Sequence, residues 1–89
     1  MTRAEFVDAA LTYCDLTDAS VSSWKRTVKH NTAVGGVVQS AHLFGLAVDV
    51  VYDAPVALPL AMERARRLGL RLLREADHDH LQPVDWTKS

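Results

Sequence analysis

An aspartate lies in the middle of the most apolar stretch of this sequence. The run 46–51 reads LAVDVV, and Asp49 is its only charged residue. The run has the length and composition of a buried β-strand. An ionised carboxylate in such a strand is costly unless a partner compensates its charge. The sequence therefore predicts a partner for Asp49, and an edge-strand charge that prevents aggregation is the alternative interpretation.

Length and composition favour one small globular domain that spans residues 1–89. The chain is 48% hydrophobic and has a formal net charge of -1. The charge does not favour a nucleic-acid or membrane partner, and neither is expected. A domain of this size is marginally stable and often depends on a metal or a partner. The single cysteine, Cys14, excludes an internal disulfide, and the sequence leaves the oligomeric state open.

The beginning of the sequence, MTRAE, lacks the hydrophobic segment of a signal peptide. No stretch approaches the ~20 apolar residues of a membrane-spanning helix. We therefore expect synthesis in the cytoplasm without a signal peptide. A role outside the cell would need another route of release.

Hydrophobic spacing and turn residues predict an α+β domain with a small sheet and flanking helices. A helix is expected over residues 2–14, where Thr2 and Glu5 form a capping-box pattern. A second helix is expected over 58–74, with Gly69 either tolerated within it or ending it early. Strands are expected over 21–24, 46–52 and 78–82.

Two further polar groups do not fit a core: His42 and the run 77–80, which reads DHDH. Side chains alternate along a strand, so His78 and His80 share one face and Asp79 takes the other. One carboxylate and two imidazoles form a good ligand set for zinc. A metal ion would neutralise Asp49 inside its apolar strand. The alternatives are a surface or hydrogen-bonded core histidine for His42 and a solvated loop for DHDH.

These residues also form two motifs that resemble a known family. Residues 40–49 match the pattern S-x-H-x-x-G-x-A-x-D, and residues 77–80 match D-H-x-H. In this order the motifs resemble the zinc murein peptidases, which include D-Ala-D-Ala carboxypeptidases, penicillin-insensitive endopeptidases and phage L-alanyl-D-glutamate endopeptidases. The resemblance covers a motif-bearing core of residues 22–82. It implies the fold shared with the hedgehog signalling domain, a small antiparallel sheet with flanking helices.

The resemblance implies a set of metal ligands and a general base. His42, Asp49 and His80 would bind Zn²⁺, by their positions in the two motifs. His78 or Asp77 would act as the base. The strand argument favours His78, because it shares a face with His80, whereas Asp77 reaches the site only if the strand begins after it.

The same family carries an arginine before its first motif, which would hold the substrate or the oxyanion. The matching stretch here places Lys25 after Trp24, with Arg26 next, as if one residue were inserted. Arg26 is favoured as the catalytic cation, because lysine is a poorer bidentate donor, and Lys25 stays open as the alternative. Lys25, Gln39 and Ser40 are expected to contribute to substrate binding.

The resemblance therefore implies a zinc metallopeptidase that hydrolyses an amide bond in peptidoglycan stem peptides. It leaves open a carboxypeptidase or an endopeptidase. The missing signal peptide fits a phage endolysin that is released or delivered to the cell wall, although a cytoplasmic role in muropeptide recycling needs no export. Two other classes compete: a catalytically inactive zinc-containing binding module of the same fold, and a small structural protein without a metal.

Overall fold

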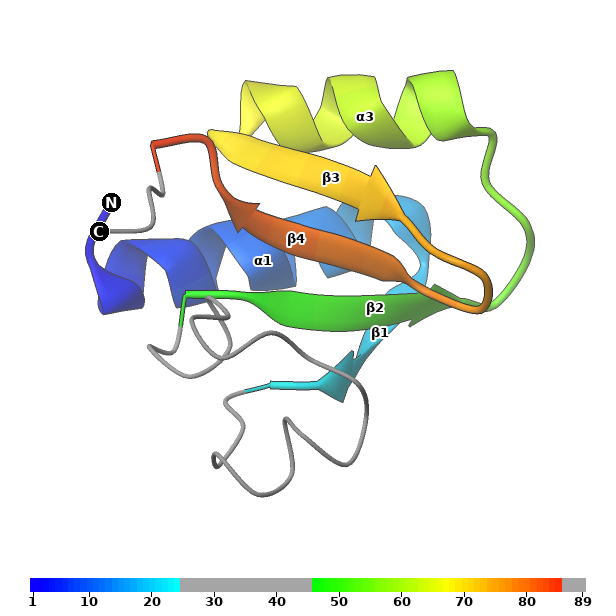
Figure 1. Cartoon of the computed structure of the whole chain (residues 1–89), viewed down its shortest axis with the longest axis horizontal. Coiled ribbons are helices and arrows are strands. Elements are labelled where there is room, and N and C mark those ends of the chain that lie inside the picture. The colour runs from blue at the N-terminus through cyan, green and yellow to red at the C-terminus, as the bar shows by residue number, and fades with distance from the viewer. Residues whose placement is uncertain (25–45, 86–89) are drawn as a thin grey trace.

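The computed structural model describes residues 1–24 and 46–85 (Figure 1). In these residues the element order is α1 (Arg3–Thr17), β1 (Ala19–Ser23), β2 (Val48–Tyr52), α3 (Leu58–Arg67), β3 (Leu70–Arg74) and β4 (Asp79–Pro83). The strands form one antiparallel sheet in the order β1-β2-β4-β3. The prediction of an α+β fold with a small antiparallel sheet and flanking helices is confirmed.

Helix α1 begins as the sequence predicts. The Thr2 side chain accepts a hydrogen bond from the Glu5 amide, and the Glu5 carboxylate accepts one from the Thr2 amide. This capping box satisfies two amide groups that the first helical turn leaves without partners. The helix continues three residues beyond the predicted end and stops at Asp18, whose φ of 52° is left-handed.

The second predicted helix is wrong over its last third. Helix α3 ends at Arg67, and residues 70–74 form strand β3 instead. Gly69 lies between the two elements with a φ of 77°, a conformation that glycine adopts without strain. Leu70 and Leu72 are buried and Arg71 is exposed, which is the alternation of a strand. The prediction failed because leucines at this spacing fit both a helical and a strand pattern.

One face of the sheet packs against both helices, and we call it the helix face (Figure 1). It contributes strand side chains that alternate along β2, β3 and β4 to the core: Val48, Val50, Leu70, Leu72 and Leu81. Helix α1 adds Phe6, Ala10, Tyr13 and Cys14, and α3 adds Ala61 and Ala65. The small alanines of α3 allow the helix to approach the sheet closely.

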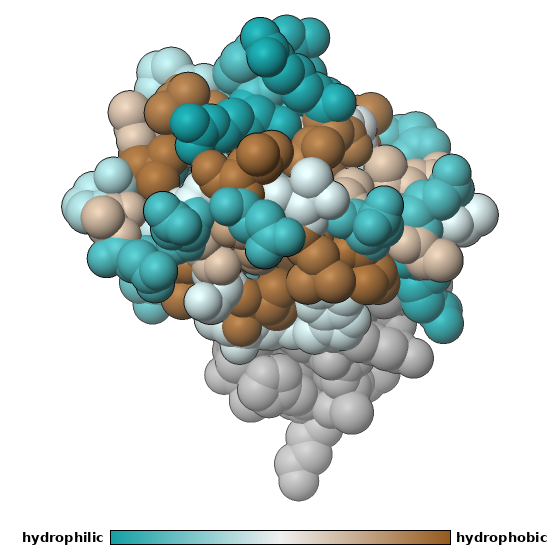
Figure 2. All heavy atoms as spheres, turned by 180° about the vertical axis from the view of Figure 1, so that it is seen from behind, coloured by the Kyte–Doolittle hydropathy of each residue, from teal (hydrophilic) through white to brown (hydrophobic). Residues whose placement is uncertain are grey.

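Several large hydrophobic side chains of the described residues are exposed, among them Leu11, Leu16 and Met62. Figure 2 shows hydrophobic and hydrophilic side chains interspersed over the side of the molecule that is turned away in Figure 1. Among the described residues, no helix is both long and apolar enough to span a membrane.

Candidate metal centre

Asp49 and His80 face each other across two paired strands. The register of β2 and β4 aligns Val48 with Leu81 and Asp49 with His80. Because Val48 and Leu81 belong to the helix face, alternation turns Asp49 and His80 to the opposite side of the sheet. We call this side the histidine face. The strand pairing thus brings together two predicted ligands that are 31 positions apart in the sequence.

The Asp49 carboxylate lies close to two imidazole rings. Its Oδ1 is 3.4 Å from Nδ1 of His80 and 3.6 Å from Nε2 of His78. Asp49 is 5% exposed, so it is buried as its apolar neighbours predicted. The structure therefore gives this buried carboxylate two nitrogen-bearing neighbours.

Gln82 favours one tautomer of His80, the ring whose Nδ1 faces Asp49. The Gln82 Oε1 atom lies 2.8 Å from Nε2 of His80. A carbonyl oxygen only accepts hydrogen bonds, so Nε2 is the donor, and in the neutral ring Nδ1 then keeps its lone pair. A neighbour that sets the tautomer of a ligand histidine in this way is typical of metal sites. Sequence reasoning missed Gln82, although its position two residues after His80 places it on the same face of the strand.

His78 lies at the end of the β3–β4 turn, one residue before β4 begins. Its Nδ1 is 2.7 Å from Oδ1 of Asp77, whose side chain is largely exposed. Its other nitrogen, Nε2, points toward Asp49 and lies 3.9 Å from Oε2 of Glu75. Burial lowers the pKa of His78, but the hydrogen bond that its Nδ1 donates to Asp77 and the charges of Asp49 and Glu75 outweigh this effect, and the pKa rises.

This geometry distinguishes the two candidate bases, His78 and Asp77, by the direction of their polar atoms. Nε2 of His78 is directed into the cluster, whereas the Asp77 carboxylate bonds the outward nitrogen of the same ring. The sequence predicts that Asp77 reaches the site only if the strand begins after it. Strand β4 begins at Asp79, so this condition is met. In the structure Asp77 contacts the site through His78.

A second polar cluster lies on the helix face, directly behind the histidines. Asp79 is 1% exposed and its carboxylate receives two hydrogen bonds from Arg74, at 2.8 and 2.7 Å. Tyr52 donates a third at 2.5 Å, and the Tyr13 hydroxyl lies 2.6 Å from that of Tyr52. Burial raises the pKa of Asp79, but the hydrogen bonds from Arg74 and Tyr52 outweigh it and lower the pKa. Asp79 is therefore a paired carboxylate.

The sequence indicated only part of this cluster. Strand alternation placed Asp79 away from the histidines, but Arg74 was assigned to a helix that ends earlier. No signal in the sequence identified Tyr52 or Tyr13 as its partners. The ion pair between Arg74 and the buried Asp79 follows from the pairing of β3 with β4, which the sequence did not predict.

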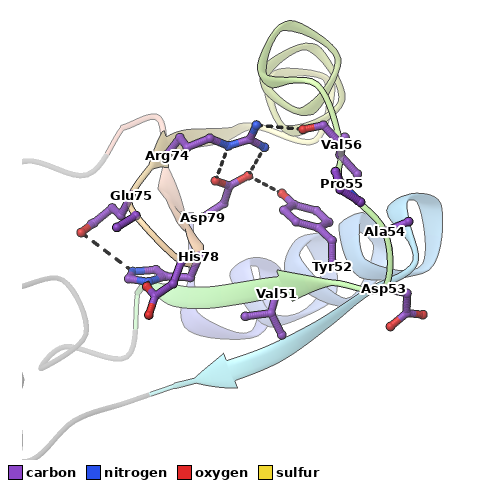
Figure 3. A pocket seen from close by; sticks show the side chains of 12 residues that line it. Val51, Tyr52, Asp53, Ala54, Pro55, Val56, Arg74, Glu75, His78 and Asp79 are labelled. Carbon is purple, nitrogen blue, oxygen red and sulfur yellow. Dashed lines mark hydrogen bonds and ion pairs between the residues drawn. The ribbon is translucent and has the colours of Figure 1, made fainter.

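A cavity of about 400 Å³ opens beside His78 (Figure 3). Its walls are the segment between β2 and α3 and the turn between β3 and β4. Arg74 joins the two walls, because its Nη1 donates a 2.8 Å hydrogen bond to the carbonyl oxygen of Val56. The lining residues are Val51, Tyr52, Asp53, Ala54, Pro55, Val56, Arg74, Glu75, Ala76, Asp77, His78 and Asp79.

Several predicted site residues lie outside the described residues. These are the third predicted ligand, the two candidate cations and two predicted substrate contacts: His42, Arg26, Lys25, Ser40 and Gln39. Within residues 1–24 and 46–85, no group of three or more His, Cys, Asp or Glu side chains could hold a metal ion by itself. The described part of the chain thus supplies two of the three predicted ligands.

The fold and this cluster define an α+β domain with a histidine–aspartate centre on one face of a small antiparallel sheet. The family model for Peptidase M15 matches residues 2–82. The chain therefore belongs to the peptidase M15 family, which is the family of the zinc murein peptidases. Searches of curated proteins and of solved structures gave no significant match.

Proposed function

We propose that this chain is a zinc-dependent peptidase that hydrolyses an amide bond in peptidoglycan stem peptides. Membership in the peptidase M15 family supports a peptidase of the murein-peptidase kind. The observation that carries the proposal is the approach of Asp49 Oδ1 to Nδ1 of His80, at 3.4 Å across β2 and β4.

The Asp49–His80 distance matches what two ligands of one zinc ion require. Zinc binds histidine nitrogen and carboxylate oxygen at ~2.1 Å, and two such atoms in a tetrahedral site are about 3.4 Å apart. The donors also suit zinc chemically, since one is a carboxylate and the other is an imidazole nitrogen with its lone pair directed inward. The pair therefore fits the metal that the family implies.

The proposed ligand set is completed by His42, which the first motif places seven residues before Asp49. Three protein ligands leave one position open, which is typical of catalytic rather than structural zinc sites. When bound, zinc polarises the substrate carbonyl and activates water as a nucleophile at neutral pH.

The role of His78 follows from its two hydrogen-bonding directions. Asp77 holds Nδ1 at 2.7 Å and thereby leaves Nε2 as the acceptor. Nε2 points toward Asp49 and would take a proton from the attacking water, then return it to the leaving amine. Asp77 is the orienting partner of this base. Arg26 would stabilise the developing oxyanion, and Lys25, Gln39 and Ser40 would contact the substrate.

The finer substrate assignment also belongs to this proposal. The scissile bond would lie next to a D-residue, as in D,D-carboxypeptidases or L-alanyl-D-glutamate endopeptidases. We propose that the protein reaches the cell wall by release or by phage delivery, as an endolysin does. Hydrolysis of purified sacculi, with identification of the new termini by mass spectrometry, distinguishes the two bond types.

Metal content and hydrolysis, measured on the same variants, test the proposal. Purified wild-type protein should contain about one zinc per chain by inductively coupled plasma mass spectrometry. Asp49→Asn, His80→Gln and His42→Gln should each lose the zinc and the hydrolysis of muropeptides. His78→Gln should keep the zinc and lose only hydrolysis. Asp8→Asn on the exposed side of α1 is the matched control and should change neither.

Two results would overturn the proposal in different ways. Absence of zinc from the wild type, with no binding on titration, would remove the metallopeptidase assignment. Stoichiometric zinc without hydrolysis of any muropeptide would favour the inactive binding module of the same fold.

A further inference from the structure

Asp79 and His80 are adjacent in β4 but serve opposite faces of the sheet. Asp79 is directed to the helix face, where Arg74 and Tyr52 hold its carboxylate (Figure 3). His80 is directed to the histidine face, opposite Asp49. Any change in how β4 is placed along its neighbours moves both residues at once.

The same strand register serves both clusters. In the pairing of β3 with β4, Arg74 lies opposite Asp79; in the pairing of β2 with β4, His80 lies opposite Asp49. A slip of one residue would turn every side chain of β4 to the other face. It would bury the imidazole of His80 against the helices and separate it from Asp49.

The Arg74–Asp79 pair, in which the carboxylate is buried and the arginine side chain is one-third exposed, is directional in a way that hydrophobic packing is not. Nε and Nη2 of Arg74 meet the two oxygens of Asp79 at 2.8 and 2.7 Å, which is a bidentate arrangement. The third nitrogen, Nη1, is bonded to the carbonyl oxygen of Val56. Tyr52 adds a bond from β2, so side chains of β2 and β3 both hold the carboxylate of β4, and Arg74 links it to the segment before α3.

Stability alone is a weak reason for such a cluster. A buried ion pair is often replaced by apolar side chains of similar size without loss of stability, because desolvation offsets the attraction between the charges. What apolar side chains do not supply is a single preferred alignment of two strands. Leu72 and Leu81 would pack in more than one register, whereas the fork of Arg74 accepts Asp79 in one.

We infer that Arg74, Asp79 and Tyr52 are positioning residues, which hold β4 in the one register that places His80 opposite Asp49. The expected effect on zinc binding rests on the proposed function. The register of β4 does not, because it is a property of the metal-free protein. The polar cluster on the helix face thus serves the cluster on the histidine face through the backbone of β4.

The test replaces the pair by apolar residues and measures register and zinc affinity separately. In the double variant Arg74→Met/Asp79→Leu, the nuclear Overhauser effects between Asp49 and His80 report the β2–β4 register without metal. We expect them to weaken or disappear while the helical and strand content stays unchanged. The dissociation constant for zinc, measured by competition with a chelator, should rise at least about tenfold.

Matched variants separate positioning from a general effect of lost charge. Glu63→Leu/Arg67→Met removes an exposed ion pair on α3 by the same substitutions. It should leave both measurements at their wild-type values. Arg74→Lys keeps the charge without the bidentate fork and should give intermediate values.

Wild-type register contacts in the folded double variant would overturn the inference, and so would an unchanged zinc affinity. If the double variant does not fold, the Asp49–His80 register contacts and the zinc affinity of Arg74→Lys test the inference instead. If the wild type itself binds no zinc, the proposed function fails, and the register contacts alone decide the positioning inference.

Discussion

On each side of the sheet a buried carboxylate lies beside nitrogen-bearing side chains, but the separations differ. On the helix face, the oxygens of Asp79 lie 2.7 and 2.8 Å from nitrogens of Arg74, within direct hydrogen-bonding distance. On the histidine face, the closest approaches of Asp49 to the imidazoles of His80 and His78 are 3.4 and 3.6 Å. Both separations exceed a good hydrogen bond, and the Asp49–His80 separation is the one that the proposed zinc ligands would require.

The two buried aspartates of this small sheet therefore have different partners. Asp79 is paired with Arg74 and Tyr52. Asp49 is arranged beside imidazole nitrogens in a way that suits a cation. Alternation along β4 and the first motif already distinguish the two aspartates in the sequence. In the structure, the contact distances and the types of partner distinguish them as well.

The largest expected effect is the loss of the proposed metal function in Asp49→Asn. Asparagine has nearly the same shape but removes the charge that would bind the ion. Hydrolysis should fall about a thousandfold, which corresponds to the loss of several kcal/mol of Lewis-acid stabilisation. The measurement is the muropeptide hydrolysis rate at saturating zinc. Activity within tenfold of the wild type would show that Asp49 is no ligand.

The next effect is on stability, in Arg74→Met. This change leaves the carboxylate of Asp79 buried without its cation, which costs about 3 kcal/mol, at the low end for broken buried pairs because the Arg74 side chain is one-third exposed. Urea unfolding followed by circular dichroism measures the loss. Asp79→Leu added to this variant should recover most of it, since the uncompensated charge is then gone.

A smaller effect is expected in Gln82→Leu. Without the Gln82 oxygen as acceptor for Nε2, the ring tautomer of His80 is no longer fixed, and the zinc affinity should fall about tenfold. Gln82→Glu keeps an acceptor at the same place and should bind zinc at least as tightly as the wild type. Nitrogen-15 spectra of the histidine rings report the tautomer in each variant. An unchanged Nε2–H tautomer in Gln82→Leu would refute this role.

The smallest effect is expected at an exposed ion pair that serves as a reference for both clusters. Hydrogen bonds from Arg66 and then Arg67 lower the pKa of Glu63 on the surface of α3. A lowered folded-state pKa contributes stability above the ordinary pKa, and this contribution disappears as the pH falls through the folded-state value. Because the pair is exposed, Glu63→Gln should not measurably change stability at neutral pH. Carbon-13 titration should show the Glu63 pKa rising in Arg67→Met.

Much of the fold could be predicted from short-range patterns. The capping box at Thr2 and Glu5 and the apolar run around Asp49 correctly located α1 and β2. Strand β3 could not be predicted, because the leucines after Gly69 satisfy a helical and a strand spacing alike. The sequence alone does not say that Gly69 adopts a positive φ, and this conformation decides between the two.

The site was predictable where it depends on alternation and motif, and unpredictable where it depends on pairing. Alternation correctly placed Asp79 away from His80, and the structure brings Asp49 beside His80 and His78. Arg74 was missed because its partner lies across a paired strand, and such partners are set by register, which a single sequence does not reveal. Gln82 was missed although alternation alone places it on the same face as His80.

The turn between β3 and β4 carries a further consequence for how this chain can change in evolution. A backbone hydrogen bond of 2.9 Å from the amide of Glu75 to the carbonyl of His78 closes that turn. Insertion or deletion of one residue at the start of β4 would exchange the positions of the aspartate and the histidine on the two faces. Two residues could be gained or lost there without this exchange. Length variants of this hairpin are therefore expected to differ by even numbers.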